Sequence, residues 1–138
     1  MGLSDMPSPP RLPEAIVAAI RAGKYFGIQT GDGSHRFMAI WVVEQNGRVF
    51  ARSWTMKPNG WHRTMVEEGR GRLRAGEREI PVRAKLVRSE RIKDAVTKAY
   101  FAKYDTPGSL MYCRGFARGR RRDSTIEFLP ASSRAARR

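Results

Sequence analysis

The dipeptide Asn46-Gly47 lies between two apolar runs and constrains the fold of this chain more than any other feature. A two-residue type I′ turn needs positive φ at both central positions, which Asn followed by Gly adopts readily. We therefore predict a hairpin over His35–Trp54 with a register fixed by the turn. That register places these residues opposite one another: Val43 and Phe50, Trp41 and Arg52, Ala39 and Trp54, Val42 and Ala51, Ile40 and Ser53.

The two faces of this predicted hairpin differ in chemistry. One face is small and apolar, as a closed core requires: Met38, Ile40, Val42, Val49 and Ala51. The other face combines two arginines with aromatic rings: Arg48, Arg52, Phe37, Trp41, Phe50 and Trp54. Such a face is suited to stacking a flat ring and holding an anion, or to a cation–π contact of Arg52 with Trp41. An exposed aromatic patch is equally typical of a dimer interface.

Composition narrows the class of protein and of partner. A chain of 138 residues fits one domain, and its formal net charge is +14. Such a charge favours anionic partners, namely phosphate groups, nucleic acid or an anionic lipid surface, although a codon bias towards arginine produces the same excess. A single cysteine, Cys113, excludes an intramolecular disulfide, and no apolar run approaches the ~20 residues that span a bilayer. We expect a cytoplasmic protein.

Local patterns predict further elements on both sides of the hairpin. Pro13 and Gly23 bracket a short helix. A strand over Tyr25–Thr30 is followed by Asp32-Gly33, a second type I′ pattern, which pairs Ile28 with Phe37 and Thr30 with His35. A short helix is predicted over Trp61–Glu68, with Asn59 as a candidate cap and Gly69 as its stop.

The second half of the chain begins with another predicted hairpin, around Gly76-Glu77. It places Leu73 opposite Ile80 and Arg74 opposite Glu79, and Pro81 indicates an edge strand or a bulge. The elements predicted after it are a helix over Ser89–Tyr104, a loop over Ser109–Asp123 and a strand over Ser124–Leu129. We expect a mainly β fold of about six strands with two or three flanking helices, closing into a small barrel. The expected organisation is an arm (1–12), the barrel domain (13–130) and a basic tail (131–138).

The order of these elements resembles a known superfamily. The pattern is the strand that ends in Trp41-Val42-Val43, a turn, the strand over 49–53, a loop into a short helix, and an arginine-rich strand. It is similar to the FMN-binding split β-barrels, which include the pyridoxamine-phosphate-oxidase-like flavoproteins and the deazaflavin-dependent nitroreductases, and most of all to an uncharacterised bacterial family of that superfamily. The resemblance implies a split β-barrel, a homodimer, and FMN or a deazaflavin as cofactor of an oxidoreductase.

The resemblance also implies a set of cofactor-binding residues. By position, Arg36 and Trp41 would border the flavin ring, and Arg52 and Ser53 would reach the phosphate. Where the oxidases have a basic pair, this chain has Trp61, His62 and Arg63. The chain departs from the pattern there, because Trp61 replaces a basic residue and His62 is largely neutral at pH 7. We expect Arg52 and the Trp61–Arg63 turn to hold an anionic phosphate together.

Other kinds of site find little support in the residues. No pair of carboxylates and no nucleophile with its own base is evident, so no catalytic residue is assigned. His35, His62 and Cys113 match no zinc spacing, so no metal site is predicted. Two alternatives to a flavoprotein stay open: a split barrel without a cofactor, and a nucleic-acid-binding protein that uses basic runs such as Arg118–Arg122 and Arg134–Arg138.

Overall fold

The computed structural model describes residues 10–30, 36–55 and 60–131, and its centre is a seven-stranded antiparallel sheet. The strands are β1 (Phe26–Thr30), β2 (Met38–Ile40), β3 (Val42–Gln45), β4 (Arg48–Ala51), β5 (Gly71–Ala75), β6 (Arg78–Leu86) and β7 (Ile126–Pro130). The helices in the same residues are α2 (Glu14–Ala22), α3 (Trp61–Glu68), α4 (Glu90–Lys103), α5 (Pro107–Phe116) and α6 (Gly119–Asp123). The mainly β fold with flanking helices is confirmed, and the described residues hold seven strands and five helices where about six strands and two or three helices were expected.

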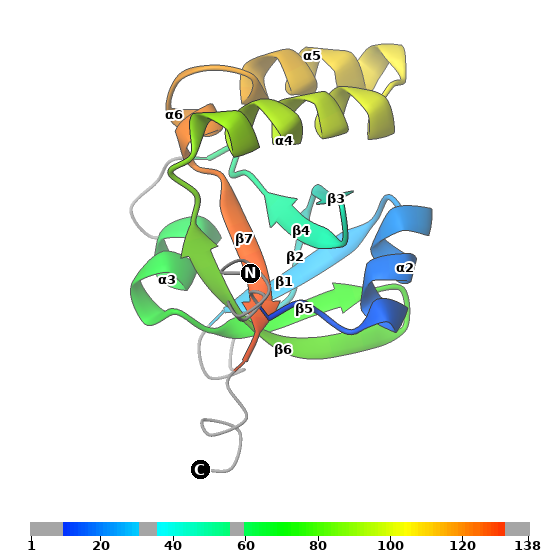
Figure 1. Cartoon of the computed structure of the whole chain (residues 1–138), viewed down its shortest axis with the longest axis vertical. Helices are drawn as coiled ribbons and strands as arrows, with labels where there is room; N and C mark the ends of the chain where they lie inside the picture. Colours follow the sequence, from blue (N-terminus) through cyan, green and yellow to red (C-terminus); the bar gives the residue numbers. More distant parts are fainter. Residues whose placement is uncertain (1–9, 31–35, 56–59, 132–138) are drawn as a thin grey trace, which may run out of the picture.

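The sheet curls into a nearly closed barrel (Figure 1). The strand order is β2-β1-β5-β6-β7-β4-β3, so β2 and β3 form opposite edges although only Trp41 separates them in the sequence. The Asn46-Gly47 turn has positive φ at both residues, and β3 pairs with β4 in the predicted register. The prediction of one continuous strand over His35–Val43 was wrong, because β2 pairs with β1 instead of β4. Closing the barrel requires the chain to change partners between β2 and β3.

The pairing of β1 with β2 differs by one residue from the prediction. Ile28 is opposite Met38, not Phe37, and Phe26 is opposite Ile40. This register puts Phe26, Ile28, Met38 and Ile40 on one face of the sheet. The two-residue turn would have put Phe37 on that face instead. Burial of apolar side chains therefore outweighs the preference for that turn. Met38 is nevertheless 51% exposed, because it lies at the start of the short strand β2. The predicted turn itself lies outside the described residues, as does His35, the predicted partner of Thr30.

The second hairpin has the predicted register, with Leu73 opposite Ile80 and Arg74 opposite Glu79. The assignment of Pro81 to an edge or a bulge was wrong, because β6 is an interior strand that pairs with β5 and β7. The carbonyl of Pro81 accepts a hydrogen bond from Ala131 N. The N and C=O of one residue point to the same side of an antiparallel strand, so the missing N–H faces the end of β7 and no β5–β6 bond is lost.

The largest local correction concerns residues 109–123, which form α5 and α6 instead of a loop. Thr106 begins α5: its side chain accepts a hydrogen bond from Ser109 N, and Pro107 occupies the first helical position. The other helices follow the prediction, and Ser89 caps α4 by accepting from Ile92 N.

Apolar side chains gather in two cores. The first fills the barrel and includes residues of α2 and α3, together with Leu12, which had been assigned to the arm. The second lies between the barrel and the layer of α4 and α5, which run side by side across one end of the molecule (Figure 1). Phe50 is fully buried there and Trp41 is half-buried. The two helices thus cover much of the aromatic face that was expected to lie in a dimer interface.

We predict that Gly71→Ala lowers the free energy of unfolding by about 1–3 kcal/mol, the usual cost of overpacking a core. A Cβ atom at Gly71 would collide with the carbonyl oxygen of Gln29 and lie 2.6 Å from Met65 Sδ. Urea unfolding measures the effect. Gly108→Ala is the control, because a Cβ atom at Gly108 meets nothing within 4 Å. Equal unfolding midpoints for the two variants would contradict the packing described here.

Candidate functional site

A cleft of about 380 Å³ lies where β2, the end of β4, the start of α3 and the helix α5 meet. Its lining is mostly apolar and aromatic: Met38, Ala39, Ile40, Trp41, Arg52, Trp54, Thr55, Trp61, Tyr112 and Phe116. Pockets for small molecules generally measure roughly 300–1,000 Å³ and have linings of this kind. The cleft is therefore large enough for a flat ring system.

Trp41 forms one wall and is held rigidly. Its ring stacks on Tyr104, with 4.2 Å between ring centres and 4° between planes, and it meets Tyr112 edge-on. The Tyr104 hydroxyl accepts from Val42 N and lies 3.1 Å from Val42 O, to which it donates. Burial raises the pKa of Tyr104, so the phenol stays protonated at neutral pH. Trp41 is thus fixed where the barrel closes.

Trp54 follows β4 and lies at the mouth of the cleft, with 39% of its surface exposed. It packs edge-on against Tyr112 and Phe116, with ring centres 5.0 Å and 5.5 Å away. The contact with α5 requires glycine at 115, because a Cβ atom there would lie 2.5 Å from Trp54 Cζ3. The guanidinium of Arg121 lies 3.7 Å from the centre of the Trp54 ring.

Trp61 is the first residue of α3 and is 7% exposed. Its neighbour His62 is outside the lining of the cleft, and its Nε2 lies 2.6 Å from the carbonyl oxygen of Ser124. Burial lowers the pKa of His62, while the contact with Ser124 opposes that shift. The imidazole is therefore neutral at pH 7 and does not replace the cation that the resemblance implies.

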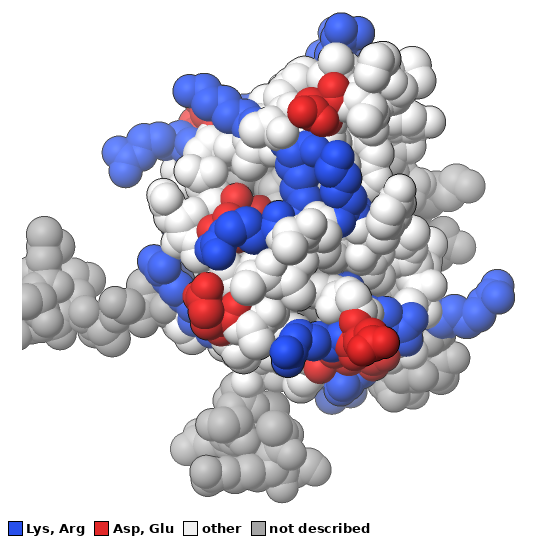
Figure 2. All heavy atoms as spheres, turned by 90° about the vertical axis from the view of Figure 1, so that its right-hand side faces the viewer, with Lys and Arg blue, Asp and Glu red and all other residues white. Residues whose placement is uncertain are grey.

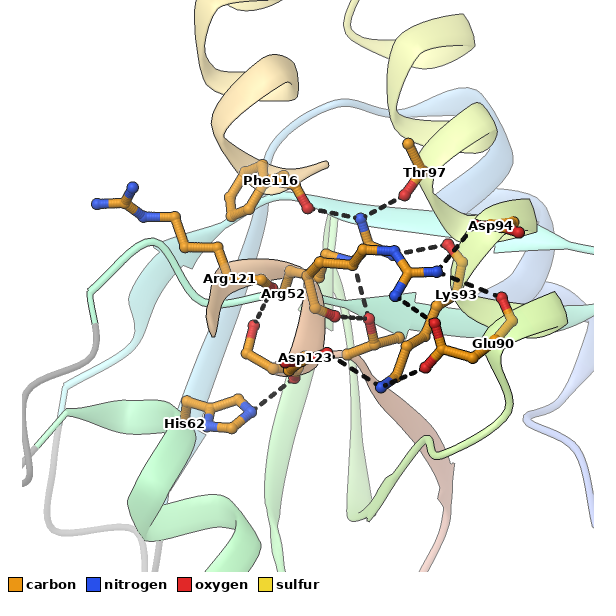
Figure 3. Close-up of polar contacts among 12 residues, drawn as sticks. Arg52, His62, Glu90, Lys93, Asp94, Thr97, Phe116, Arg121 and Asp123 are labelled. Carbon is orange, nitrogen blue, oxygen red and sulfur yellow. Dashed lines mark hydrogen bonds and ion pairs between the residues drawn. The ribbon is translucent and has the colours of Figure 1, made fainter. Parts of the chain in front are cut away.

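Arg52 is 2% exposed, and its side chain is occupied by the protein (Figure 3). It donates four hydrogen bonds, to Thr125 Oγ1 (2.8 Å), Thr97 Oγ1 (2.7 Å), Phe116 O (2.7 Å) and Lys93 O (2.7 Å). Burial lowers its pKa to about 10, so it remains charged at neutral pH. Its aromatic contact is with Tyr100, not with Trp41 as expected. These bonds join the residue after β4 to α4, to the end of α5 and to the residue before β7, and they leave little of the guanidinium for a ligand.

The other predicted site residues lie away from the cleft lining. Ser53 is buried; its N–H donates to Ser124 Oγ, and its hydroxyl donates to Thr55 O. Arg63 is exposed and pairs with Glu67 at 3.2 Å, and Arg36 is exposed before β2. The structure therefore brings together Trp41, Arg52 and Trp61, but not Arg36, Ser53, His62 and Arg63.

Sequence reasoning missed the contribution of α5. Tyr112 and Phe116 line the cleft from a segment that was predicted to be a loop. The pattern that indicates this helix was present, since Thr106-Pro107 begins it and Tyr112 and Phe116 are one turn apart. The position of Arg121 over Trp54 follows from the same correction, because α6 continues from α5.

The described residues contain no metal-binding cluster, one buried thiol and no helix that could cross a membrane. Across residues 10–30, 36–55 and 60–131, no three His, Cys, Asp or Glu residues are grouped so that they could hold a metal ion. Cys113 is buried, its Sγ lies 3.4 Å from the carbonyls of Tyr100 and Tyr104, and burial raises the pKa of the thiol. No helix in the same residues has the length and apolar character to cross a membrane.

We predict that Arg52→Met lowers the free energy of unfolding by about 2–4 kcal/mol, because buried acceptors lose a charged donor. Arg91→Met on α4 is the control, since the Arg91 side chain is exposed and makes no hydrogen bond or ion pair within the described part of the chain. The control should change stability by less than about 0.5 kcal/mol. Urea unfolding compares the two, and equal midpoints would exclude the structural role of Arg52.

His62 predicts a pH dependence of stability. Its folded pKa is lowered from 6.5, so the unfolded chain takes up a proton first as the pH falls. The free energy of unfolding should therefore decrease between about pH 7 and pH 5, before most carboxylates titrate. In His62→Gln, which retains a donor for Ser124 O, this decrease should be smaller. Urea unfolding at several pH values measures the slope, and the same slope in both proteins would refute the assignment.

The comparisons with known proteins agree with this architecture. Residues 17–128 match the model of a family described as "Uncharacterized protein conserved in bacteria (DUF2255)". The conserved hypothetical protein Rv2991 from Mycobacterium tuberculosis is 12% identical, with 90% of this chain and 82% of that chain covered and a TM-score of 0.57. A "Putative Pyridoxamine 5'-phosphate oxidase" from Listeria innocua is also 12% identical, with 86% and 93% covered and a TM-score of 0.58. A comparison with curated proteins gave no match. The chain belongs to the DUF2255 family and has a split-barrel fold.

Proposed function

We propose that the cleft binds the planar ring of a flavin-type cofactor, FMN or a deazaflavin, in an oxidoreductase. One observation carries the proposal: Trp41, Trp54 and Trp61 converge on a single cleft of about 380 Å³. Aromatic side chains stack on flat rings in offset or edge-on arrangements. The fold shared with a protein described as a pyridoxamine 5'-phosphate oxidase supports the same class of ligand.

The ring of such a cofactor fits the residues present. The stack of Trp41 on Tyr104 fixes one wall, and the edge-on contacts of Tyr112 with Trp41 and Trp54 connect it to the mouth. A wall that is already ordered loses little conformational freedom when a ligand binds, which favours affinity. The cleft is therefore suited to a rigid aromatic ligand.

The residues implied for the phosphate do not fit that role as placed here. Arg52 donates to four protein acceptors, the Ser53 hydroxyl donates to Thr55 O, and His62 is kept neutral by burial. Arg63 is paired with Glu67 outside the lining. Trp41 and Trp61 therefore keep the ring-binding role, and the phosphate would need a different cation.

A bound flavin would supply the electron-transfer chemistry itself. The contribution of this chain is to bind and orient the ring, and the described residues that line the cleft include no carboxylate or imidazole to move a proton. Trp54 and Tyr112, at 39% and 41% exposure, would shield the ring from water. Specificity for a substrate would then depend on the shape of this mouth.

We also propose a homodimer that covers the mouth of the cleft. The helices α4 and α5 bury Phe50 but leave Met38, Trp54 and Tyr112 exposed beside one another in the lining. Exposed apolar groups that line one site are typical of an interaction surface. A second copy over this mouth would bury them and shield the ring further.

The nucleic-acid alternative receives less support from the surface. Figure 2 shows acidic side chains beside the basic ones on the face it displays, without a continuous basic stripe. Ion pairs such as Arg21–Glu44 and Arg74–Glu79 hold opposite charges together in the same way. A nucleic-acid backbone is usually bound along an uninterrupted basic groove.

The test is a fluorescence titration of the protein with FMN, riboflavin and a deazaflavin. We expect saturable binding of at least one of them, and about a tenfold loss of affinity in Trp54→Ala, on the scale measured for stacking of one ring. Trp54 is chosen because its partial exposure limits the effect on folding. Tyr25→Ala is the control, since Tyr25 is 90% exposed and outside the cleft lining.

Two results would contradict the proposal in different ways. Unchanged affinity in Trp54→Ala would place the binding site elsewhere on the chain. The absence of saturable binding by any of the three compounds would favour the split barrel without a cofactor. Visible absorbance of the purified protein in the flavin bands distinguishes a flavin-binding protein from the split barrel without a cofactor, independently of the titration.

A further inference from the structure

Arg121 is a cation that the structure fixes beside the cleft. Its guanidinium lies 3.7 Å from the centre of the Trp54 ring, and its Nε donates to Trp54 O at 2.8 Å. Trp54 itself lines the cleft and packs against Tyr112 and Phe116. A stacked guanidinium with one hydrogen bond in place has lost much of its freedom before any ligand arrives.

The terminal nitrogens of Arg121 remain available for a ligand. Neither Nη atom meets an acceptor in the described part of the chain, and Figure 3 shows the side chain extending away from the Arg52 network. The adjacent Arg122 differs, because its Nη atoms donate to Glu90 and Asp94. Arg121 therefore combines a fixed position with an open edge of N–H donors.

The acids that the structure describes in α4 and α6 are paired with cations other than Arg121. Asp123 pairs with Lys93 at 3.2 Å, and Glu90 and Asp94 are taken by Arg122 at 2.7 and 2.8 Å. Arg121 is also partly buried, which reduces the screening of its charge by water. The site is thus ready for an external anion, and a planar fork of donors is suited to phosphate oxygens.

We propose that Arg121 binds the phosphate of a ligand whose ring occupies the cleft, so that this site prefers a phosphorylated planar ligand to its neutral counterpart. This inference rests on the proposed function, and it gives Arg121 the phosphate-binding role for which the buried Arg52 is unavailable. Trp54 lines the cleft, and the guanidinium of Arg121 stacks on its ring. The residues that would bind the ring and the phosphate of the ligand are therefore in contact.

The experiment compares FMN with riboflavin, which share one ring system and differ in the phosphate. We expect the wild type to bind FMN about tenfold more tightly than riboflavin, the scale of a hydrogen bond to a charged group. In Arg121→Gln this preference should disappear because FMN affinity falls, whereas riboflavin affinity should stay within about twofold. Arg120→Gln, with the same loss of charge at an exposed neighbour that has no partner among the described residues, should keep the preference.

The outcomes separate this inference from the proposed function. Equal binding of FMN and riboflavin by the wild type would overturn the role of Arg121 while leaving ring binding intact. If neither flavin binds, the proposed function fails, and inorganic phosphate alone then tests Arg121. Phosphate should produce a saturable NMR shift of the Arg121 Nε–H and the Trp54 indole N–H, with the indole shift lost in Arg121→Gln. The absence of that shift in the wild type would refute the anion site.

Discussion

The hydrogen bonds of the buried Arg52 guanidinium hold the layer of α4 and α5 on the barrel. A charge removed from water costs several kcal/mol unless hydrogen bonds replace its hydration. Here two threonine hydroxyls and two backbone carbonyls, those of Lys93 and Phe116, replace it. Phe116 ends α5, where the negative end of the helix dipole attracts a cation. The same side chain therefore holds α4 and α5 against β4 and β7.

The cleft is a consequence of that arrangement. Once α5 is seated, Tyr112 and Phe116 face the tryptophan that follows β4, and Gly115 permits the close approach. Trp41 reaches the same space because the barrel closes there, between its two edge strands, and because Tyr104 at the end of α4 stacks on it. The site is thus built at the junction between barrel closure and helix layer, not along one element.

Three arginines illustrate how packing assigns different roles to one residue type. Arg52 is enclosed and structural, Arg122 is bound by Glu90 and Asp94, and Arg121 is held on Trp54 with no acceptor for its Nη atoms among the described residues. The three side chains are chemically identical, and the neighbouring sequence does not distinguish an arginine that is free to bind an anion from one that is structural. The distinction depends on which acceptors the folded chain places within reach.

The sequence by itself determined what neighbouring residues decide together. The positive φ angles of Asn46-Gly47 set the β3–β4 register, the alternation of apolar residues set the hairpin at Gly76-Glu77, and Ser89 began α4 where predicted. Only the tertiary structure decided the break at Trp41, the burial of Arg52 and the place of Arg121, since these depend on contacts between residues far apart in the chain. A local sequence pattern reflects the backbone preferences of a few neighbouring residues. Whether a charged side chain is buried, or which strand an edge pairs with, depends instead on residues that are distant in the sequence.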